Sequence, residues 1–459
     1  MESEVALHTP EVWSFWGNSP TDWARWHRYS GTAPLDLVLG DVNYDDCSFD
    51  IALHGTLQDR AARDAIRRIH LWSEDQEFLS SIISTLTATR GRVRSNSVDS
   101  FILSNDGIKL VDVSDFFAHY RFPKLRHLEL DDCRIASWDL LMSRTAVLTT
   151  LILHLGYPSP TPTTSQLLSI LASNPTLRKV SLSRCAVPVD GGGKSPFQVP
   201  LHHLKELKLT GGSRHVIGLL HRLDHPTYMD TLDIALCDCV VLDIPQIIGP
   251  YLRDYLRRRG RPQNGLGLSV FQAGQAGLHA TLCVGDVCAF DPSTPMWGQV
   301  ATFVKVTVTL DQTMATNRDR SVKGVLDLIP YTPRDEIVYF RSWGEPAAME
   351  YISINLPNLR TLQFGGMRLS AALRGSNLDG NDNFWPFLQH IFIERLFVED
   401  DGWDPLATFL AHRASSGNRL GSLVVVSSPH MCLEVEERIR GLVQEFRVDV
   451  DSLGRGTRP

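Results

Sequence analysis

The segment Leu125-Arg126-His127-Leu128-Glu129-Leu130 decides the fold, because leucines occupy its first, fourth and sixth positions. In a short strand with its preceding turn, these three side chains point to one buried side, and the residues between them face solvent or a partner. One such strand cannot bury its apolar side alone. The segment therefore predicts a chain of stacked copies, whose product is a surface.

The same spacing of three apolar residues, at positions one, four and six, recurs along the chain, and each copy is called a frame here. Residues 123–130, 175–182 and 357–364 share the fuller pattern P-x-L-R-x-(L/V)-x-(L/F). Proline lacks an N–H, so it suits the turn before a strand. Strict and looser frames together begin at Pro34, Ile66, Val98, Leu125, Leu148, Leu177, Leu204, Met229, Gly265, Phe303, Arg334, Leu359, Leu388 and Leu420. Their mean step is about 30 residues, slightly above the usual leucine-rich repeat, and uneven steps indicate insertions.

Between frames, apolar residues recur three and four positions apart, which predicts amphipathic helices behind parallel strands. The segments with this pattern are 138–142, 165–173, 215–223, 245–256, 405–413 and 434–446. The predicted fold class is therefore α/β, an irregular leucine-rich-repeat solenoid with the parallel sheet on the concave side and helices on the convex side. Frames are weakest between 240 and 355, where the β-branched run 303–310 favours an insertion or a longer hairpin.

Three cysteines follow the frames at one fixed offset. Cys133, Cys185 and Cys237 each stand eight residues after a frame start, where leucine-rich repeats place Asn or Cys facing the interior. A small buried hydrophobe is the favoured interpretation, ahead of a metal ligand. The sequence holds no C-x-x-C pair, so disulfides are not implied. An intracellular location, cytoplasmic or nuclear, is expected.

Charge and hydropathy argue against two classes of partner. The formal net charge is −7, from 45 basic and 52 acidic residues, so no polyanion-binding stripe is expected and we predict no nucleic acid partner. A basic cluster at 253–261 is interpreted as the end of a helix, with a phosphate or RNA contact as the alternative. No apolar run approaches 18 residues, which predicts no membrane partner.

Candidate catalytic motifs fail on their spacing. Residues 190–195, D-G-G-G-K-S, are similar to the end of a phosphate loop, but Pro188 stands where the first glycine is required. Acidic clusters at 131–132, 379–382 and 399–401 are interpreted as solvated loop carboxylates, with metal or glycoside chemistry as the alternative. We therefore expect no enzyme activity, no cofactor and no metal site.

The N-terminal stretch differs in kind from the repeats. Trp13, Trp16, Trp23 and Trp26 form a dense aromatic group that we expect to cap the first repeat. Residues 5–14, V-A-L-H-T-P-E-V-W-S, resemble the last helix and exit of an F-box in the F-box and leucine-rich-repeat families of mushroom-forming fungi. Residues 23–37 are similar to the segment that follows it there, with the phrase R-x-S-G-T-A-P-L-D-L at 28–37.

This resemblance implies the substrate-recognition subunit of a Skp–cullin–F-box ubiquitin ligase, in which the F-box binds the Skp adaptor and the repeats bind the target. The leading helix and the C-R-x-W element of the F-box are missing before residue 5. Adaptor binding is therefore expected only if a full F-box is present upstream. The alternative is a stand-alone repeat scaffold or decoy. The expected division is an F-box tail and cap at 1–33, about fourteen repeats at 34–450, and a flexible tail at 451–459.

A protein target is expected on the concave face, where alternate strand side chains point away from the core. These side chains mix both signs of charge, and the alternative is that they are only solvated sheet residues. Lys179 and Glu206 could pair across adjacent strands. The predicted partner-binding residues are His127, Glu129, Asp131, Thr150, His154, Lys179, Ser181, Ser183, Glu206, Lys208, Thr210 and Asp233.

Overall fold

The fold was analysed in a computed structural model. It describes residues 15–16, 34–40, 65–87, 97–107, 109–120, 122–139, 141, 147–155, 161–184, 198–224, 229–237, 244–259, 264–273, 279–287, 300–309, 323–343, 348, 356–366, 369, 385–395, 402–426, 431 and 433–449. The chain divides into two compact units, unit 1 at Met1–Met229 and unit 2 at Asp230–Pro459, and each is described by itself.

Unit 1 contains a sheet in which every pair of neighbouring strands is parallel. The strands follow one another across the sheet in chain order, as expected when each strand is linked to the next by a crossover. In this order they are β1 (Phe15–Trp16), β2 (Leu35–Leu39), β3 (Ile66–Ser73), β4 (Ser100–Asn105), β6 (His127–Asp131), β8 (Thr150–His154), β9 (Lys179–Ser183) and β11 (Glu206–Gly212).

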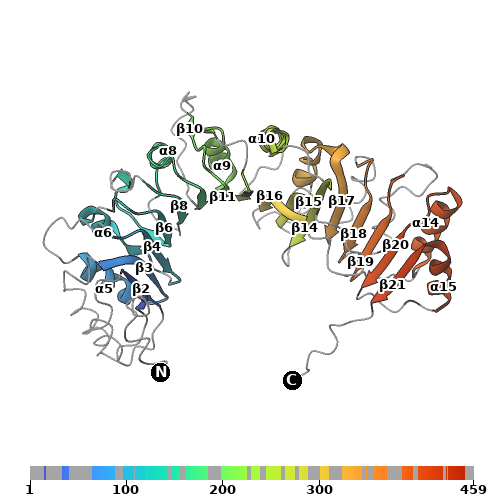
Figure 1. The fold of residues 1–459 in the computed structure, drawn as a ribbon, viewed down its shortest axis with the longest axis horizontal. Helices are drawn as coiled ribbons and strands as arrows, with labels where there is room; N and C mark the ends of the chain where they lie inside the picture. Colours follow the sequence, from blue (N-terminus) through green and yellow to red (C-terminus); the bar gives the residue numbers. More distant parts are fainter. Residues whose placement is uncertain are drawn as a thin grey trace, which may run out of the picture. The chain divides into compact units, whose positions relative to one another are not determined.

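Helices cover one face of this sheet. They are α5 (Gln76–Thr87), α6 (Ser114–His119), α8 (Thr164–Ala172) and α9 (Ser213–Leu220), and Figure 1 shows α6, α8 and α9 on the same side of the strands. The frame leucines Leu125, Leu128 and Leu130 are fully buried. Two short parallel pairs, β5 (Val111–Asp112) with β7 (Cys133–Arg134) and β10 (Val199–Pro200) with β12 (Leu223–Asp224), lie in the connections.

Unit 2 combines parallel strands with an antiparallel meander. From one side, its strands are β13 (Thr231–Cys237), β16 (Val300–Thr309), β15 (His279–Val287), β14 (Leu266–Ala273), β17 (Ile337–Trp343), β18 (Thr361–Gly365), β19 (His390–Glu394), β20 (Ser422–Val426) and β21 (Glu445–Asp449). Strand β15 is antiparallel to both of its neighbours, and the other pairs are parallel. The meander of β14, β15 and β16 lies within residues 240–355, where the sequence favoured an insertion or a longer hairpin.

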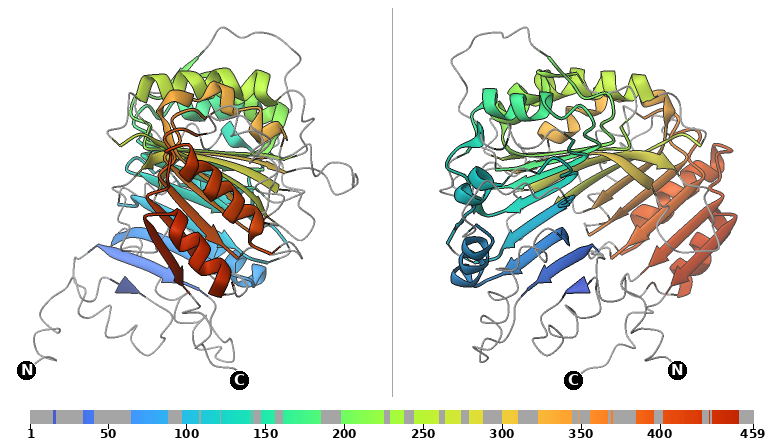
Figure 2. Two further views of the ribbon diagram at one scale, coloured as in Figure 1. Left: turned by 90° about the vertical axis from the view of Figure 1, so that its right-hand side faces the viewer. Right: turned by 60° about the vertical axis from the view of Figure 1, so that its left-hand side comes forward.

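The helices of unit 2 are α10 (Ile244–Arg259), α14 (Asp404–Ser415) and α15 (Leu433–Leu442), with the single turns η5 (Ile329–Tyr331) and η6 (Arg334–Glu336). Figure 2 shows α14 and α15 side by side. The prediction of a helix over 434–446 was wrong at its end. Phe446 lies in β21, because the helix stops before the two bend residues that lead into this strand.

The frames predicted strands well. Each of the fourteen frames falls on a strand, from β2 at Pro34 to β20 at Leu420, whereas β15, β21 and the two-residue strands β1, β5, β7, β10 and β12 had no predicted frame. The predicted helices over 165–173 and 405–413 are confirmed as α8 and α14. The fold is thus mixed α/β, with large, mostly parallel sheets and helices, and no sheet among the described residues closes on itself.

The cysteine offset gave a mixed result. Cys133 is fully buried, and its Sγ lies 3.1 Å from the carbonyl oxygen of Asp131. Burial raises the pKa of the Cys133 thiol, so it stays neutral. Cys237 is only half-buried, because it lies at the end of β13 itself, and Cys185 lies outside the described residues. The four tryptophans of the predicted cap also fall outside them, except for the backbone of Trp16.

A buried asparagine links the end of α8 to the segment before β8 by hydrogen bonds. Asn174, in the turn between α8 and β9, is fully buried. Its Nδ2 donates to the carbonyl oxygen of Ile170 at 2.9 Å, and its Oδ1 accepts from the backbone N–H of Leu148 at 3.0 Å. The carboxamide therefore joins the end of a helix to the residues that lead into β8, which no frame pattern identified.

Replacing this carboxamide should destabilise the fold. The substitution Asn174→Ala leaves the buried N–H of Leu148 without its acceptor, so we expect the free energy of unfolding to fall by about 1–3 kcal/mol. Denaturant unfolding measures this change. The control is Ser173→Ala. This neighbouring side chain is exposed, so water can replace the hydrogen bond that its hydroxyl donates to the carbonyl oxygen of Ser169. Equal effects of the two substitutions would contradict the role assigned to Asn174.

Candidate interaction surface

The face of the unit 1 sheet that lies opposite its helices is called here the open face. Successive side chains of a strand alternate between faces, so β6 buries Leu128 and Leu130 and presents the residues on either side of them. Register aligns these outward residues into three rows across β3, β4, β6, β8, β9 and β11. The rows are Arg68, Ser100, His127, Thr150, Lys179 and Glu206; then His70, Ile102, Glu129, Ile152, Ser181 and Lys208; then Trp72, Ser104, Asp131, His154, Ser183 and Thr210.

Eleven of the twelve predicted partner-binding residues belong to these rows. Most are half-buried or exposed, and Ser181 is buried with 6% of its surface accessible. The twelfth, Asp233, lies in β13 of unit 2, in register with Lys305 of β16. Register alone therefore brings the eleven together, from strands that are far apart in sequence.

Glu129 is the electrostatic centre of the open face of unit 1. The Nε2–H of His127 donates to Glu129 Oε2 at 3.3 Å. This hydrogen bond, with the charges of His127, His154 and His70, lowers the pKa of the Glu129 carboxyl despite partial burial. Burial lowers the pKa of His70, although the nearby Glu129 acts to raise it. The carboxylate of Glu129 is thus held ionised among imidazole rings.

Three further polar contacts cross the strands. Lys179 Nζ lies 3.1 Å from Glu206 Oε2, so the expected pairing of these residues is confirmed. His154 Nε2 lies 3.2 Å from the hydroxyl of Ser181, and its Nδ1 lies 3.9 Å from Asp131 Oδ2. Such exposed pairs contribute little to the stability of the fold.

Sequence reasoning missed the contribution of β3 to this face. The ring centroids of His70 and Trp72 are 5.0 Å apart, and the Trp72 ring lies where a Cβ on Gly40 would have to be. Only glycine leaves room for this close approach. The frame beginning at Ile66 identified the strand, and its alternation places Arg68, His70 and Trp72 outward, but the predicted partner-binding residues began only at His127.

The open face of unit 2 is more aromatic. Phe271 and Trp343 lie in register on β14 and β17, and the Arg341 guanidinium lies 5.0 Å from the centre of the Phe271 ring. The Trp343 ring covers Gly365, whose added Cβ would lie 2.6 Å from Trp343 Cζ3. Next to it, Glu394 is 9% exposed, and burial raises the pKa of its carboxyl although Arg341 and Arg395 oppose this. No sequence pattern indicated this cluster, since β17 belongs to the weakest frames.

Among the described residues, no three His, Cys, Asp or Glu side chains are arranged to hold a metal ion. None of the helices that the structure describes combines the length and the apolar character needed to cross a membrane.

Comparison with known proteins gives no assignment. No protein-family model matches the chain, and a search of curated proteins also gives no match. The geometry of the described residues is therefore the basis for function, together with the sequence resemblance at residues 5–37.

The ionisation of Glu129 should be visible in the pH dependence of stability. Because its folded-state pKa lies below the ordinary value of 4.5, its stabilising contribution is present above that value and is lost as pH falls through the folded-state pKa. We expect Glu129→Gln to lower the free energy of unfolding by up to about 1 kcal/mol at neutral pH. The difference should vanish in acid. Denaturant unfolding at several pH values measures it.

The neighbouring Ser100→Ala, which removes an uncharged side chain in register with His127, is the control and should leave the pH dependence unchanged. A Glu129→Gln deficit that stays constant down to the acid limit would show that the carboxylate charge does not stabilise the fold.

Proposed function

We propose that the chain is a leucine-rich-repeat solenoid that acts as a protein-interaction module and binds a protein target on the open faces of its sheets. The observation that carries this proposal is the register of the outward rows in unit 1. Six neighbouring strands from β3 to β11 present three side chains each on a face that none of the described helices covers. Five strand spacings extend over about 24 Å, which is enough for a helix or an extended segment of a partner.

The chemistry of the rows supports a protein target. His127, Glu129 and Lys179 offer both signs of charge and several hydrogen-bonding groups. Half-buried aromatic side chains, Trp72 in unit 1 and Trp343 in unit 2, add the kind of anchor that dominates the energy of protein interfaces. A polar surface with a few aromatic anchors is typical of protein recognition.

The finer proposal is that this module is the substrate-recognition part of a Skp–cullin–F-box ubiquitin ligase. Its support is the resemblance of residues 5–14 and 23–37 to the end of an F-box and the segment after it. The alternative proposal is a stand-alone repeat scaffold or decoy that binds its target without a ligase. Neither proposal requires catalytic chemistry in the chain itself.

Target binding can be tested by exchanging one ion pair. The double substitution Lys179→Glu with Glu206→Lys keeps an opposite-charge pair across β9 and β11 while it reverses the charge pattern of the open face. We expect unchanged thermal stability and the loss of cross-linked partner proteins from cell extract. Cross-linking followed by mass spectrometry measures the partner set.

The matched control exchanges Glu436 and Arg440, an i,i+4 pair with 2.7 Å between Arg440 Nη2 and Glu436 Oε1 on α15. This exchange should preserve the partner set. Identical partner sets for the wild type and the Lys179–Glu206 exchange would contradict recognition through the open face of unit 1.

The ligase proposal has a separate test. A form of the protein extended upstream to include a complete F-box should co-elute with a purified Skp adaptor in size-exclusion chromatography, because the F-box is the adaptor-binding element that the resemblance implies. The control is the same extended form with the added segment scrambled. Failure of the extended form to bind, or the absence of an in-frame F-box upstream, would favour the scaffold or decoy.

A further inference from the structure

The residues at the start of the strands of unit 1, which directly precede the strand or, in β3, form its second residue, make a row along one edge of its sheet. Backbone hydrogen bonds of 2.7–2.8 Å join each of these residues to its counterpart on the next strand. We call them the amino-edge row: Arg67, Asp99, Arg126, Thr149, Arg178 and Lys205. Neighbouring strands lie about 4.8 Å apart, so Arg126 and Lys205 are separated by about 14 Å.

This row is strongly basic. Four of its six members are Arg or Lys, and Lys124 lies two residues before Arg126. Arg126 and Arg178 are the arginines of the P-x-L-R motif. Both are exposed, whereas the leucine before each of them is buried. Neighbouring carboxylates are already engaged, since Asp36 pairs with Arg67 at 3.3 Å and Glu206 pairs with Lys179 at 3.1 Å.

The four exposed cations of this edge, Lys124, Arg126, Arg178 and Lys205, have no carboxylate of a described residue within ion-pair distance. They are therefore free to accept anionic groups from outside the chain. Lone surface cations are common, but three within about 14 Å, with Lys124 two residues before the first of them, form a concentrated positive edge.

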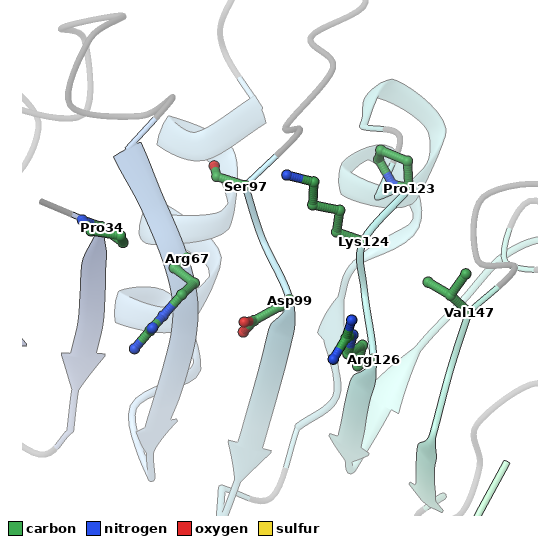
Figure 3. Close-up of a pocket in the computed structure, with 8 residues that line it drawn as sticks. All are labelled: Pro34, Arg67, Ser97, Asp99, Pro123, Lys124, Arg126 and Val147. Atoms are coloured by element: carbon green, nitrogen blue, oxygen red, sulfur yellow. The ribbon is translucent and has the colours of Figure 1, made fainter. Parts of the chain in front are cut away.

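A cavity opens at the same edge. It has a volume of about 540 Å³, and Arg67, Ser97, Asp99, Lys124 and Arg126 are among its lining residues. Figure 3 shows the Lys124 ammonium group directed towards Ser97, with Asp99 between Arg67 and Arg126. Three cations and one carboxylate therefore surround a space that is large enough for the side chain of an acidic residue.

We propose that the amino-edge row binds an acidic segment of the protein partner in an extended conformation. One carboxylate enters the cavity between Lys124 and Arg126, and further carboxylates contact Arg178 and Lys205. An extended segment of about five residues spans the distance from Arg126 to Lys205. This inference deepens the proposed function, on which it rests, because it names the chemistry of the partner.

Charge distribution favours an acidic protein segment over nucleic acid. The net charge of the chain is −7, and Asp36, Asp99 and Glu206 lie among the cations of this edge. A nucleic acid backbone with its regular phosphates would meet these carboxylates, whereas a peptide can place acidic residues only where the cations are. Complementary spacing of charges provides specificity of this kind.

The test uses a fluorescein-labelled peptide of five alternating Asp and Glu residues flanked by glycines, titrated with the full chain in fluorescence anisotropy. We expect saturable binding that weakens as salt rises from about 50 to about 200 mM. The matching Asn/Gln peptide should not bind. The double variant Arg126→Gln with Arg178→Gln should lose about tenfold or more in affinity.

The matched control is Arg360→Gln. Arg360 holds the same position of the P-x-L-R motif in unit 2, but its neighbours along that edge are Val338 and Gln389, so it lacks a basic row. This variant should bind the peptide like the wild type. A peptide carrying phosphoserine, tested in parallel, distinguishes the two sources of the anion, because tighter binding identifies a phosphorylated segment.

Equal peptide affinity of the wild type and the Arg126–Arg178 variant, or tighter binding of a single-stranded RNA of similar length, would overturn this proposal. Thermal unfolding verifies that the variants keep their fold. The proposed function fails separately, since exchange of Lys179 and Glu206 tests the open face and leaves the four amino-edge cations in place.

Discussion

One-sided burial of the frame residues is the constraint on which the rest of the structure depends. Leu128 and Leu130 of β6 are fully buried, and in register with them lie Leu151 and Leu153 of β8, which are equally buried. Each such side chain contributes about 1.5–3 kcal/mol when it leaves water. A slip of one residue between two strands would turn both leucines outward, so burial sets the register. Every alignment of surface side chains follows from that register.

The same burial of frame residues occurs in both units, but the order of the strands and the side chains on the outward face differ. In unit 1 the sheet is parallel throughout, and register produces long rows of polar outward residues such as His127, Thr150 and Lys179. In unit 2 the meander of β14, β15 and β16 interrupts the parallel order. Parallel order resumes at β17, where Trp343 packs over Gly365 beside the buried Glu394. The same kind of burial therefore supports a polar face in one unit and an aromatic face in the other.

The apolar frames predicted most strands, but they did not predict the side-chain contacts between different strands and helices. The frames found fourteen strands because three apolar positions and a turn are properties of one short segment. They missed β15, and they missed β21 because the apolar positions Val443, Phe446 and Val448 were interpreted as the end of a helix. The contact of Trp72 with Gly40 joins two strands, so no single frame shows it. The carboxamide of Asn174 was equally invisible, since its two partners, Ile170 and Leu148, lie on different elements. Information that arises between segments is absent from a pattern within one segment.

The arginine of the P-x-L-R motif has different neighbours in the two units, which the motif itself does not indicate. Arg178 and Arg360 share the P-x-L-R motif, and both are exposed directly before a strand. Arg178 lies between Thr149 and Lys205 along its edge, whereas Arg360 lies between Val338 and Gln389. Like charges on adjacent strands, as at Arg178 and Lys205, do not stabilise a sheet. The leucines hold the strands together without help from these cations, so stacking alone does not explain a basic edge in unit 1. Its physical effect is a positive field along this edge, and that field exists only because register aligns residues from separate strands.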